Sequence, residues 1–310
     1  MITTIKYKDR EEWLAIRRKY IGGSDAASVI GMNPFRSAYT LWAEKTGRVP
    51  EFEGNLTTEV GTYLEDFVAK KFEESTGKKV RRKNATFVNS LYPWACANVD
   101  REIVGGENAL LEIKTMTSVP IMRQLRGEDF PEAYYCQCVH YLAVTGKARI
   151  YLAVLIRNRE LKIYTLERDE AEIKALMNAE AEFWKYVEED KEPPVDGTVS
   201  TEETLGELYP TSSDANVDLT SFDAEMDEYF NICDRIKELE DLKREKANKI
   251  KEYMGDAARG EGATFSVSYR ATERETLDFK NARSYIPQAV LEKFLKKSTS
   301  RMFKITKKEA

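Results

Sequence analysis

Three side chains near the middle of the chain, Asp100, Glu112 and Lys114, have the types and spacing that metal-assisted hydrolysis requires. Glu112 and Lys114 are two residues apart in the strand-like segment LLEIKT, so both side chains point to the same face of a sheet. Their neighbours are apolar, and burial of an unpaired charge is strongly unfavourable. We therefore expect a compensating group close by, although a Glu–Lys pair on a surface edge strand would also explain this segment taken alone.

The hairpin that precedes this strand determines whether Asp100 joins the pair. Two glycines mark its turn, and directly opposed residues of an antiparallel pair share a face. A three-residue loop over Gly105–Glu107 places Asp100 opposite Glu112, whereas a four-residue loop places it opposite Ile113. We predict the three-residue loop. Two opposed carboxylates repel each other, and a divalent cation between them relieves the repulsion.

The composition limits the chemistry that this site can use. His140 is the only histidine among 310 residues, which excludes sites built on two or more histidines. The spacing of the four cysteines matches neither a zinc ribbon nor a secreted disulfide framework, so we expect reduced, buried thiols. Oxygen ligands remain, and they favour Mg²⁺, with Mn²⁺ as a possible substitute. The net charge of −5 argues against nucleic-acid binding by the whole surface but leaves room for a local basic groove.

The elements that position these side chains alternate between helical and extended patterns. The sequence predicts helices over 9–20, 37–46 and 57–76, three strands between 79 and 115, a helix over 132–144, a two-strand hairpin and a helix over 169–189. The third helix carries an apolar stripe made of Val60, Leu64, Phe67, Val68 and Phe72. This order is typical of a mixed α/β layer architecture.

We expect three parts along the chain: a first domain over 1–190, a linker or meandering segment over 191–220, and an accessory region over 221–310. The accessory region has the pattern of a long helix followed by a small β-α-β motif. Apolar residues recur every three or four positions along that helix, which more often indicates an intramolecular packing face than a dimer zipper. We expect no membrane span and, without an apolar signal segment, a cytoplasmic location in a bacterium or a phage-infected host.

The spacing of Asp100, eleven further residues and then Glu-x-Lys is the motif of the PD-(D/E)xK nuclease superfamily. Six ordered segments over residues 10–150 resemble one branch of it, the YqaJ-like viral recombinases related to lambda exonuclease. The segments are WLAIRRKYIGGSDAASVIGMNPF, LWAEKTG, GTYLE, ANVDREI, LLEIKT and AYYCQCVHYLAVTG. One departure is Val99, which stands where the superfamily has proline but leaves the carboxylate in place. The resemblance implies a restriction-endonuclease-like mixed β-sheet flanked by helices, with residues 1–190 as the nuclease domain.

The resemblance also implies a catalytic role for each matching residue. Asp100 and Glu112 would bind the metal ion together with the backbone carbonyl of Ile113. Glu65, in the segment GTYLE, would complete the acidic cluster through a second ion or a bound water. Lys114 would lie beside the attacking water and orient or deprotonate it. Taken alone, Glu65 would be an ordinary solvated glutamate of a helix.

Three more residues match positions near the DNA in this family. Arg17 and Ser24 would hold a terminal phosphate, and Gln137 would lie near the active site on the helix after Pro131. Ser24 is predicted to cap a helix, and helix N-termini bind anions through free N–H groups. Asp25 beside it would weaken such a site if its side chain pointed inward. The simpler alternatives are plain capping for Ser24 and a surface amide for Gln137.

The implied function is a Mg²⁺-dependent exonuclease that digests linear double-stranded DNA from its ends, from 5′ to 3′, and leaves single strands for phage-type recombination. The implied partners are double-stranded DNA ends and a single-strand-annealing recombination protein, and the implied assembly is a homo-oligomeric ring. The basic segments 17–19 and 78–83 would either line a DNA groove or remain solvated. The alternatives are a structure-specific endonuclease that cuts flaps or junctions, and a non-catalytic DNA-binding protein that retains the fold.

Overall fold

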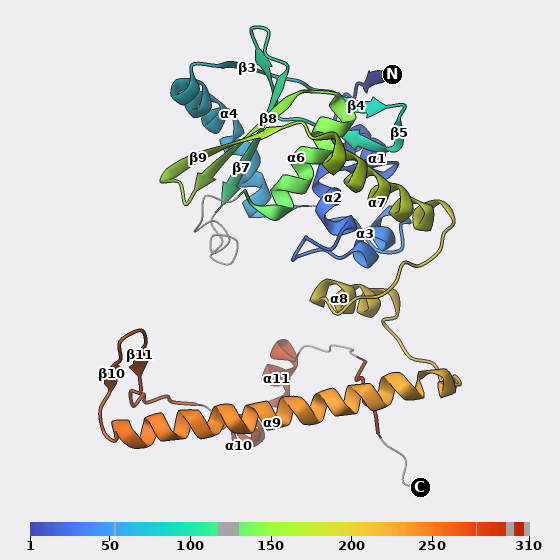
Figure 1. Ribbon diagram of the computed structural model, residues 1–310. Coiled ribbons are helices and arrows are strands. Elements are labelled where there is room, and N and C mark those ends of the chain that lie inside the picture. The colour runs from blue at the N-terminus through green and yellow to red at the C-terminus, as the bar shows by residue number, and fades with distance from the viewer. Residues whose placement is uncertain (53, 117–129, 277, 296–300, 307–310) are drawn as a thin grey trace. The chain divides into compact units, whose positions relative to one another are not determined.

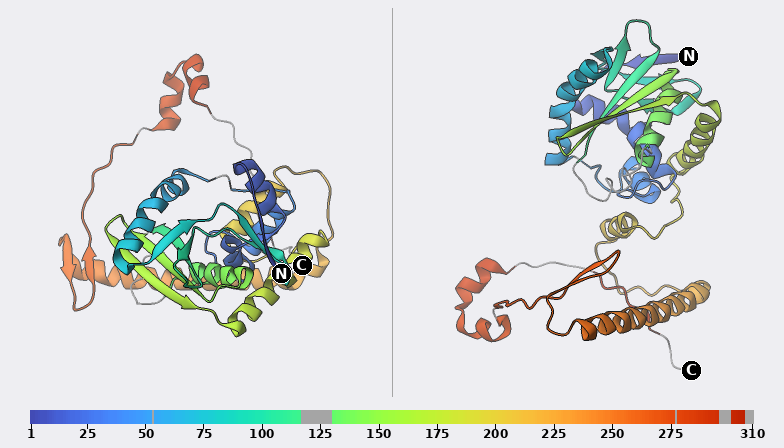
Figure 2. Two further views of the ribbon diagram at one scale, coloured as in Figure 1. Left: turned by 90° about the horizontal axis from the view of Figure 1, so that it is seen from above. Right: turned by 60° about the vertical axis from the view of Figure 1, so that its left-hand side comes forward.

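The computed structural model describes residues 1–52, 54–116, 130–276, 278–295 and 301–306. The chain forms two compact units, Met1–Tyr209 and Pro210–Ala310. The helices of the first unit are α1 (Arg10–Arg18), α2 (Gly23–Val29), α3 (Ala38–Lys45), α4 (Leu56–Thr76), α6 (Glu132–Thr145), α7 (Glu170–Glu188) and α8 (Val199–Leu208). They surround two β-sheets (Figures 1 and 2).

The larger sheet has five strands in the order β3-β6-β7-β8-β9. Their bounds are β3 (Lys79–Arg82), β6 (Arg101–Val104), β7 (Ala109–Met116), β8 (Arg149–Ile156) and β9 (Glu160–Glu167). Strands β7 and β8 pair in parallel over eight residues, and the other pairs are antiparallel, which makes the sheet mixed. The mixed sheet flanked by helices agrees with the expected fold class.

The two faces of this sheet are covered by different helices, as Figure 1 shows. Alternate residues of a strand point to opposite faces. On one face Leu111 and Ile113 pack with Val68 and Phe72 of α4. On the other face Leu110 packs with apolar residues of α6 and α7. The even-numbered positions of β7, which include Glu112 and Lys114, therefore face α6.

The smaller sheet was not foreseen. It has the order β1-β4-β5-β2, with β1 (Ile2–Ile5), β2 (Ile21–Gly22), β4 (Thr86–Asn89) and β5 (Tyr92–Ala97). The prediction of three strands between 79 and 115 is therefore wrong, because the chain forms five there and divides them between two sheets. The apolar stripe predicted for α4 is also only partly correct. Val60 and Phe67 remain about half exposed, because the strands contact only the side of α4 that carries Val68 and Phe72.

The segment expected to be a linker, 191–220, contains the helix α8. Short polar side chains join α8 to the start of α3. Thr204 and Thr40 hydroxyls lie 2.7 Å apart, and the Thr201 hydroxyl donates to Ser37 Oγ at 2.8 Å. Because Ser and Thr carry no apolar period, this contact left no helical signature in the sequence. The first unit consequently extends to Tyr209 instead of ending near 190.

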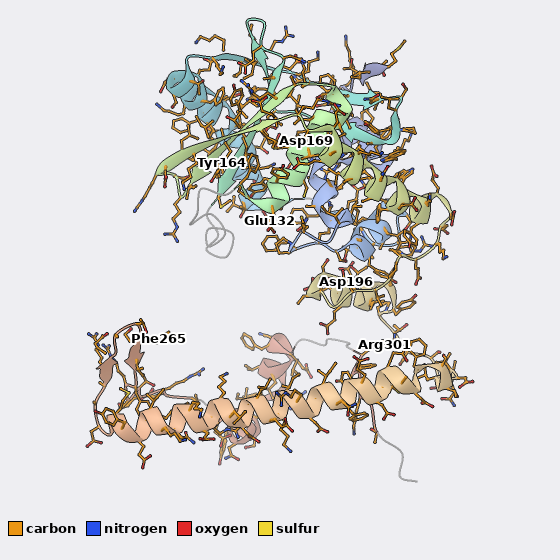
Figure 3. The ribbon with its side chains drawn as sticks, viewed as in Figure 1. Glu132, Tyr164, Asp169, Asp196, Phe265 and Arg301 are labelled. Atoms are coloured by element: carbon orange, nitrogen blue, oxygen red, sulfur yellow. The ribbon has the colours of Figure 1, made fainter. Side chains whose placement is uncertain are left out.

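The second unit is built on the long helix α9 (Asp223–Met254). It also contains β10 (Arg259–Glu261), β11 (Ser266–Ser268), α10 (Phe279–Ala282) and α11 (Gln288–Phe294). The β10–β11 hairpin is present, but residues 301–306 form no strand, so the expected β-α-β motif is incomplete among the described residues. No residue of α9 is buried, which differs from the expected packing face. Phe265, labelled in Figure 3, is also exposed.

Two further expectations concern the cysteines and the membrane. Cys96, Cys136 and Cys138 are free and buried as predicted, whereas Cys233 is exposed on α9. His140 lies in the core of the first unit, where its two ring nitrogens are hydrogen-bonded to the Glu180 carboxyl group and the Cys96 carbonyl oxygen. In the part of the chain that the structure describes, no helix combines the length and apolar character of a membrane span.

The contact between α2 and α6 depends on a glycine, and we expect Gly23→Ala to weaken it. A Cβ at position 23 would lie 2.3 Å from the ring of Tyr141, so the two helices would have to separate. We expect Gly23→Ala to lower the free energy of unfolding by about 1–3 kcal/mol, measured by urea denaturation. Gly206→Ala in α8 is the matched control, because a Cβ there meets nothing within 4 Å. Equal stability of the two variants would contradict this account.

Candidate active site

The hairpin of β6 and β7 brings Asp100 and Glu112 together. The register pairs Arg101 with Leu111 and Glu102 with Leu110, and one step further places Asp100 opposite Glu112. The predicted register is thus confirmed. Asp100 Oδ2 accepts a hydrogen bond of 2.8 Å from the backbone N–H of Ile113. This bond ties the carboxylate to the strand that carries Glu112.

Glu112 is the centre of a buried polar network and is only 2% exposed. Its Oε1 accepts hydrogen bonds from Lys114 Nζ at 2.7 Å and from Gln137 Nε2 at 2.6 Å. Gln137 comes from α6 and also donates to the hydroxyl of Tyr141 at 2.9 Å. Gln137 is buried, so the alternative of a surface amide is wrong.

The second oxygen of Glu112 has no hydrogen-bond partner among the described residues, although it is buried. Burial, followed by the charge of Asp100, raises the pKa of Glu112 to about 8. Two carboxyl groups thus meet in a site that lacks the positive charge to hold both ionised. An unsatisfied oxygen beside a second carboxylate fits a hard divalent cation.

Lys114 is the only cation in direct contact with Glu112 among the described residues. Burial lowers the pKa of Lys114, but Glu112 and Asp100 more than offset this effect, so its pKa lies above the ordinary value. Its ammonium group also lies 5.5 Å from the centre of the Tyr134 ring. The charged form of Lys114 is therefore favoured beside the two carboxyl groups.

Glu65 lies near this pair but is bound by arginines. Its Oε2 is 3.1 Å from Arg82 and 3.7 Å from Arg101. Burial and the charge of Asp100 raise the pKa of Glu65, so the acids influence one another. Within the described residues, however, no three acidic, histidine or cysteine side chains converge closely enough to enclose a metal ion. The expected three-acid cluster is therefore not assembled among the described residues, because Glu65 is held by Arg82 and Arg101.

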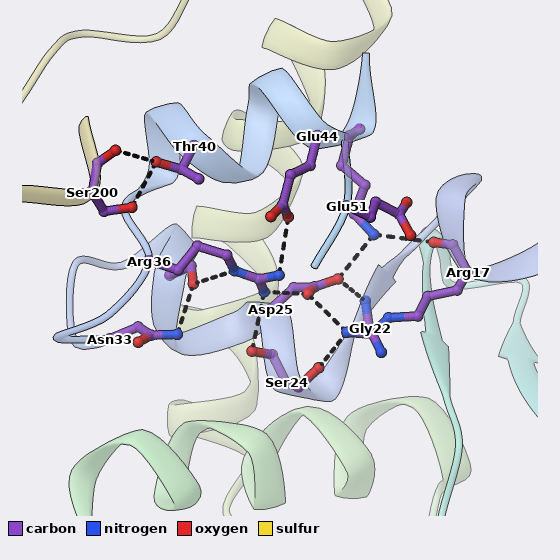
Figure 4. Close-up of polar contacts among 12 residues, drawn as sticks. Arg17, Gly22, Ser24, Asp25, Asn33, Arg36, Thr40, Glu44, Glu51 and Ser200 are labelled. Carbon is purple, nitrogen blue, oxygen red and sulfur yellow. Dashed lines mark hydrogen bonds and ion pairs between the residues drawn. The ribbon is translucent and has the colours of Figure 1, made fainter. Parts of the chain in front are cut away.

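A second charged cluster is built around Asp25 at the start of α2 (Figure 4). Arg17 donates to Ser24 Oγ at 2.7 Å and lies 3.4 Å from Asp25. Ser24 is exposed and lies in the first turn of α2, whose N-cap is Gly22. The expectation that Ser24 caps this helix is wrong, because Asp25 instead accepts a 3.0 Å bond from the Gly22 N–H.

Two cations of this cluster, Arg36 and Lys45, were missed in the sequence. Arg36 binds Asp25 directly and lies 3.1 Å from Glu44, and Lys45 Nζ is 3.0 Å from Asp25. Both lie inside or beside segments that carry the family resemblance, but no fixed spacing relates them to Asp25. Asp25 does point inward, and three cations surround its single charge. Arg17 is the most exposed of the three cations, and Glu44 and Glu51 line the same cavity.

A cavity of about 1050 Å³ is lined by residues of the Asp25 cluster and by Asp100. Arg17, Arg36 and Lys45 line one part of it, and Glu65 and Asp100 line another. From the basic segment 78–83, Arg82 and Lys83 also reach the cavity. The remaining basic residues of that segment are paired with acids, namely Lys78 with Glu107, Lys79 with Glu73 and Arg81 with Glu102. An anionic ligand in the cavity would thus meet cations in one part and Asp100 and Glu65 in another, whereas the buried Glu112 is not among the lining residues.

Comparison with known proteins agrees with this arrangement. A family model described as the YqaJ-like viral recombinase domain matches residues 12–148. The uncharacterized protein YqaJ of Bacillus subtilis (strain 168) is 39% identical over 302 residues, which cover 96% of this chain and 94% of YqaJ. The likeness therefore includes most of the second unit.

Solved structures share the fold of the first unit. The alkaline exonuclease LHK-Exo from Laribacter hongkongensis has 22% sequence identity and a TM-score of 0.50, covering 58% of this chain and 93% of that chain. LHK-Exo in complex with dAMP has 21% identity and a TM-score of 0.51, with the same coverage. At this identity the likeness shows the fold, and it confirms the expected restriction-endonuclease-like class.

The cluster around Asp25 predicts a dependence of stability on pH. Burial acts to raise the pKa of Asp25, but Lys45, Arg36, Arg17 and the Gly22 N–H together lower it well below 3.8. The ionised form is the stabilising one, so this contribution is present above pH 3.8 and is lost as the pH falls towards the lower pKa of the folded state.

We therefore expect Asp25→Asn to cost about 3–5 kcal/mol at pH 7, since three cations lose their buried partner. Urea denaturation across a pH series should show the gap to the wild type narrowing only below about pH 4. Asp190→Asn, which removes an exposed partner of Arg48, is the control and should change little. A gap that stays constant down to the lowest pH would refute the ionised state of Asp25.

Proposed function

The chain belongs to the YqaJ-like viral recombinase family, and we propose on this basis that it is an exonuclease that digests linear double-stranded DNA from its ends. The observation that carries the proposal is a cavity lined by Arg17, Arg36 and Lys45 of the Asp25 cluster and also by Asp100, one member of the carboxylate pair. LHK-Exo, which has the same fold, is an alkaline exonuclease. A phosphodiester chain carries negative charge at each link, so it can engage both ends of such a cavity together.

The metal site proposed for the reaction uses Asp100 and Glu112, the backbone carbonyl of Ile113, and Glu65 as a more distant member. The orphaned oxygen of Glu112 and the all-oxygen donor set support Mg²⁺, with Mn²⁺ as a substitute. When bound there, the ion supplies positive charge and Lewis acidity at the scissile phosphate. Release of Glu65 from Arg82 and Arg101 would let it approach the pair.

The protein's own groups supply the remaining steps. Lys114, held by Glu112 at 2.7 Å, places a fixed positive charge where negative charge develops on the phosphate and orients the attacking water. Gln137 fixes the carboxylate of Glu112 from the α6 side. Preorganised charges of this kind need no rearrangement during the reaction, which is the source of their catalytic effect.

Arg17 and Ser24 are proposed to hold the terminal phosphate of one strand at the cationic part of the cavity. The guanidinium of Arg17 is already fixed by Ser24 and Asp25, so it is preorganised for an anion. Capture of a 5′-phosphate at this point would give the enzyme its 5′ to 3′ direction. The remaining strand would pass to a single-strand-annealing protein, and a homo-oligomeric ring would keep an acidic protein on its DNA.

Digestion of linear duplex DNA tests the proposed reaction. We expect loss of a 5′ label from linear duplex in Mg²⁺ or Mn²⁺, no reaction in chelator, and no reaction on covalently closed circles, which have no ends. The readout is the release of labelled nucleotides on a denaturing gel. Cleavage of closed circles or flap junctions would instead support a structure-specific endonuclease, and binding without cleavage would support a non-catalytic protein.

The role of Lys114 is tested by Lys114→Ala. We expect cleavage to fall on the order of 10²–10³-fold, because a preorganised charge at the transition state is removed, while binding to DNA ends persists. Binding is measured by fluorescence anisotropy with labelled duplex. Lys174→Ala, which removes an exposed lysine of α7, is the control and should cleave normally. Full activity of Lys114→Ala would exclude the role assigned to this residue.

A further inference from the structure

The long helix α9 carries an apolar side that no described element of its own unit buries. Its members are between 45% and 94% exposed, and they are Tyr229, Ile232, Ile236, Leu239, Ile250 and Tyr253. We call these six residues the α9 seam. Its described aromatic contacts are edge-on packings of Tyr229 against Phe230 of the same helix and against Phe303. Figure 3 shows side chains projecting along the full length of α9.

The seam follows a seven-residue repeat. Steps of three and four residues lead from Tyr229 to Tyr253 through eight positions, and six of them are the seam residues. Lys243 and Lys246 take the other two. A repeat of this kind is typical of a helix that pairs with one other helix in a coiled coil. It also explains why the seam lacks a partner within one unit, since a straight 32-residue helix about 48 Å long needs a partner of similar length.

The charge along α9 is strongly polarised. Residues 223–241 contain eight acidic and two basic side chains, whereas residues 242–254 contain five basic and two acidic ones. A parallel pair of such helices places like halves side by side, which is electrostatically unfavourable. An antiparallel pair places each acidic half against a basic half. The charge distribution along α9 therefore favours a second helix of the same kind as the partner and an antiparallel direction for the pair.

We propose that α9 pairs with α9 of a second copy of this chain as an antiparallel two-helix coiled coil. In the register that aligns the two repeats, Tyr229 faces Tyr253 and Ile232 faces Ile250 of the other copy. The two-fold axis then passes close to Asp241, where the charge of the helix changes sign. Such an interface is self-complementary, because each contact occurs twice about the axis.

The two lysines of the repeat support this register. Lys246 would lie opposite Ile236, and Lys243 opposite Leu239. Their aliphatic stems can cover these apolar side chains while the ammonium groups reach the acidic half of the partner. The competing antiparallel register pairs Tyr229 with Leu239 and Ile232 with Ile236, but it brings the two acidic halves together and leaves Ile250 and Tyr253 uncovered.

This interface goes beyond the proposed nuclease function, since it lies wholly in the second unit and joins two copies irrespective of DNA. Its first test is the mass of the full-length particle in solution, measured by light scattering after size exclusion. We expect I232D/I236D to halve the mass of the wild-type particle. The matched control is N231D/N248D, which adds the same two charges outside the seam and should leave the mass unchanged.

If the nuclease units also assemble with one another, that assembly is the same in the wild type and in both double variants. It therefore does not change the ratios of their masses. The proposal is overturned if I232D/I236D has the mass of the wild type, which would mean that the chain's own first unit or a different protein covers the seam. Digestion of linear DNA by all three proteins shows that the first unit remains folded, and circular dichroism shows that α9 remains helical.

Cross-linking tests the direction and register. In a C233S background, which removes the exposed cysteine, we expect I232C/I250C to form a covalent dimer with a short bifunctional maleimide. The two positions of one helix are about 27 Å apart, so they cannot be joined within a chain. Neither I232C nor I250C alone should cross-link, but a mixture of the two should. A dimer from either single variant indicates a parallel pair, and no dimer from the double variant overturns the register.

Discussion

The candidate active site depends on the repulsion between the carboxyl groups of Asp100 and Glu112. The β6–β7 hairpin holds these two groups side by side. Neither carboxylate can turn away, because Asp100 is bonded to the backbone of Ile113 and Glu112 is clamped by Lys114 and Gln137. Burial then removes the water that would otherwise screen the two charges. The fold thus holds an electrostatic imbalance that a bound cation would relieve. Lys114 supplies part of this charge and is itself fixed by the pair.

Much of this centre could be predicted from the sequence because it is local. The register of a tight hairpin follows from the length of its loop, and residues two apart on one strand share a face, so Asp100, Glu112 and Lys114 could be placed together by counting. Gln137 followed only from resemblance, since nothing in its helix distinguishes a buried amide from an exposed one. The class of the sheet followed from the order of elements, because that order allows few layered arrangements.

The features that could not be predicted depend on contacts between distant segments. Arg36 and Lys45 converge on Asp25 only after α2 and α3 have packed, and no spacing in the chain encodes that meeting. The position of Glu65 depends on which face of the sheet α4 covers. The apolar stripe of α4 in the sequence is wider than the side of the helix that contacts the strands. Helix α8 is held by hydroxyl groups together with only two leucines, Leu205 and Leu208, so apolar periodicity gave no sign of it.

The contact between Gly23 and Tyr141 links the two charged clusters mechanically. Gly23 precedes Ser24 of the cationic cluster, and the Tyr141 hydroxyl accepts the hydrogen bond of Gln137, which in turn holds Glu112. If the enzyme acts as proposed, the distance between the captured phosphate and the carboxyl pair therefore depends on the packing of Gly23 against Tyr141. These two residues would influence the reaction through that distance, without touching the DNA.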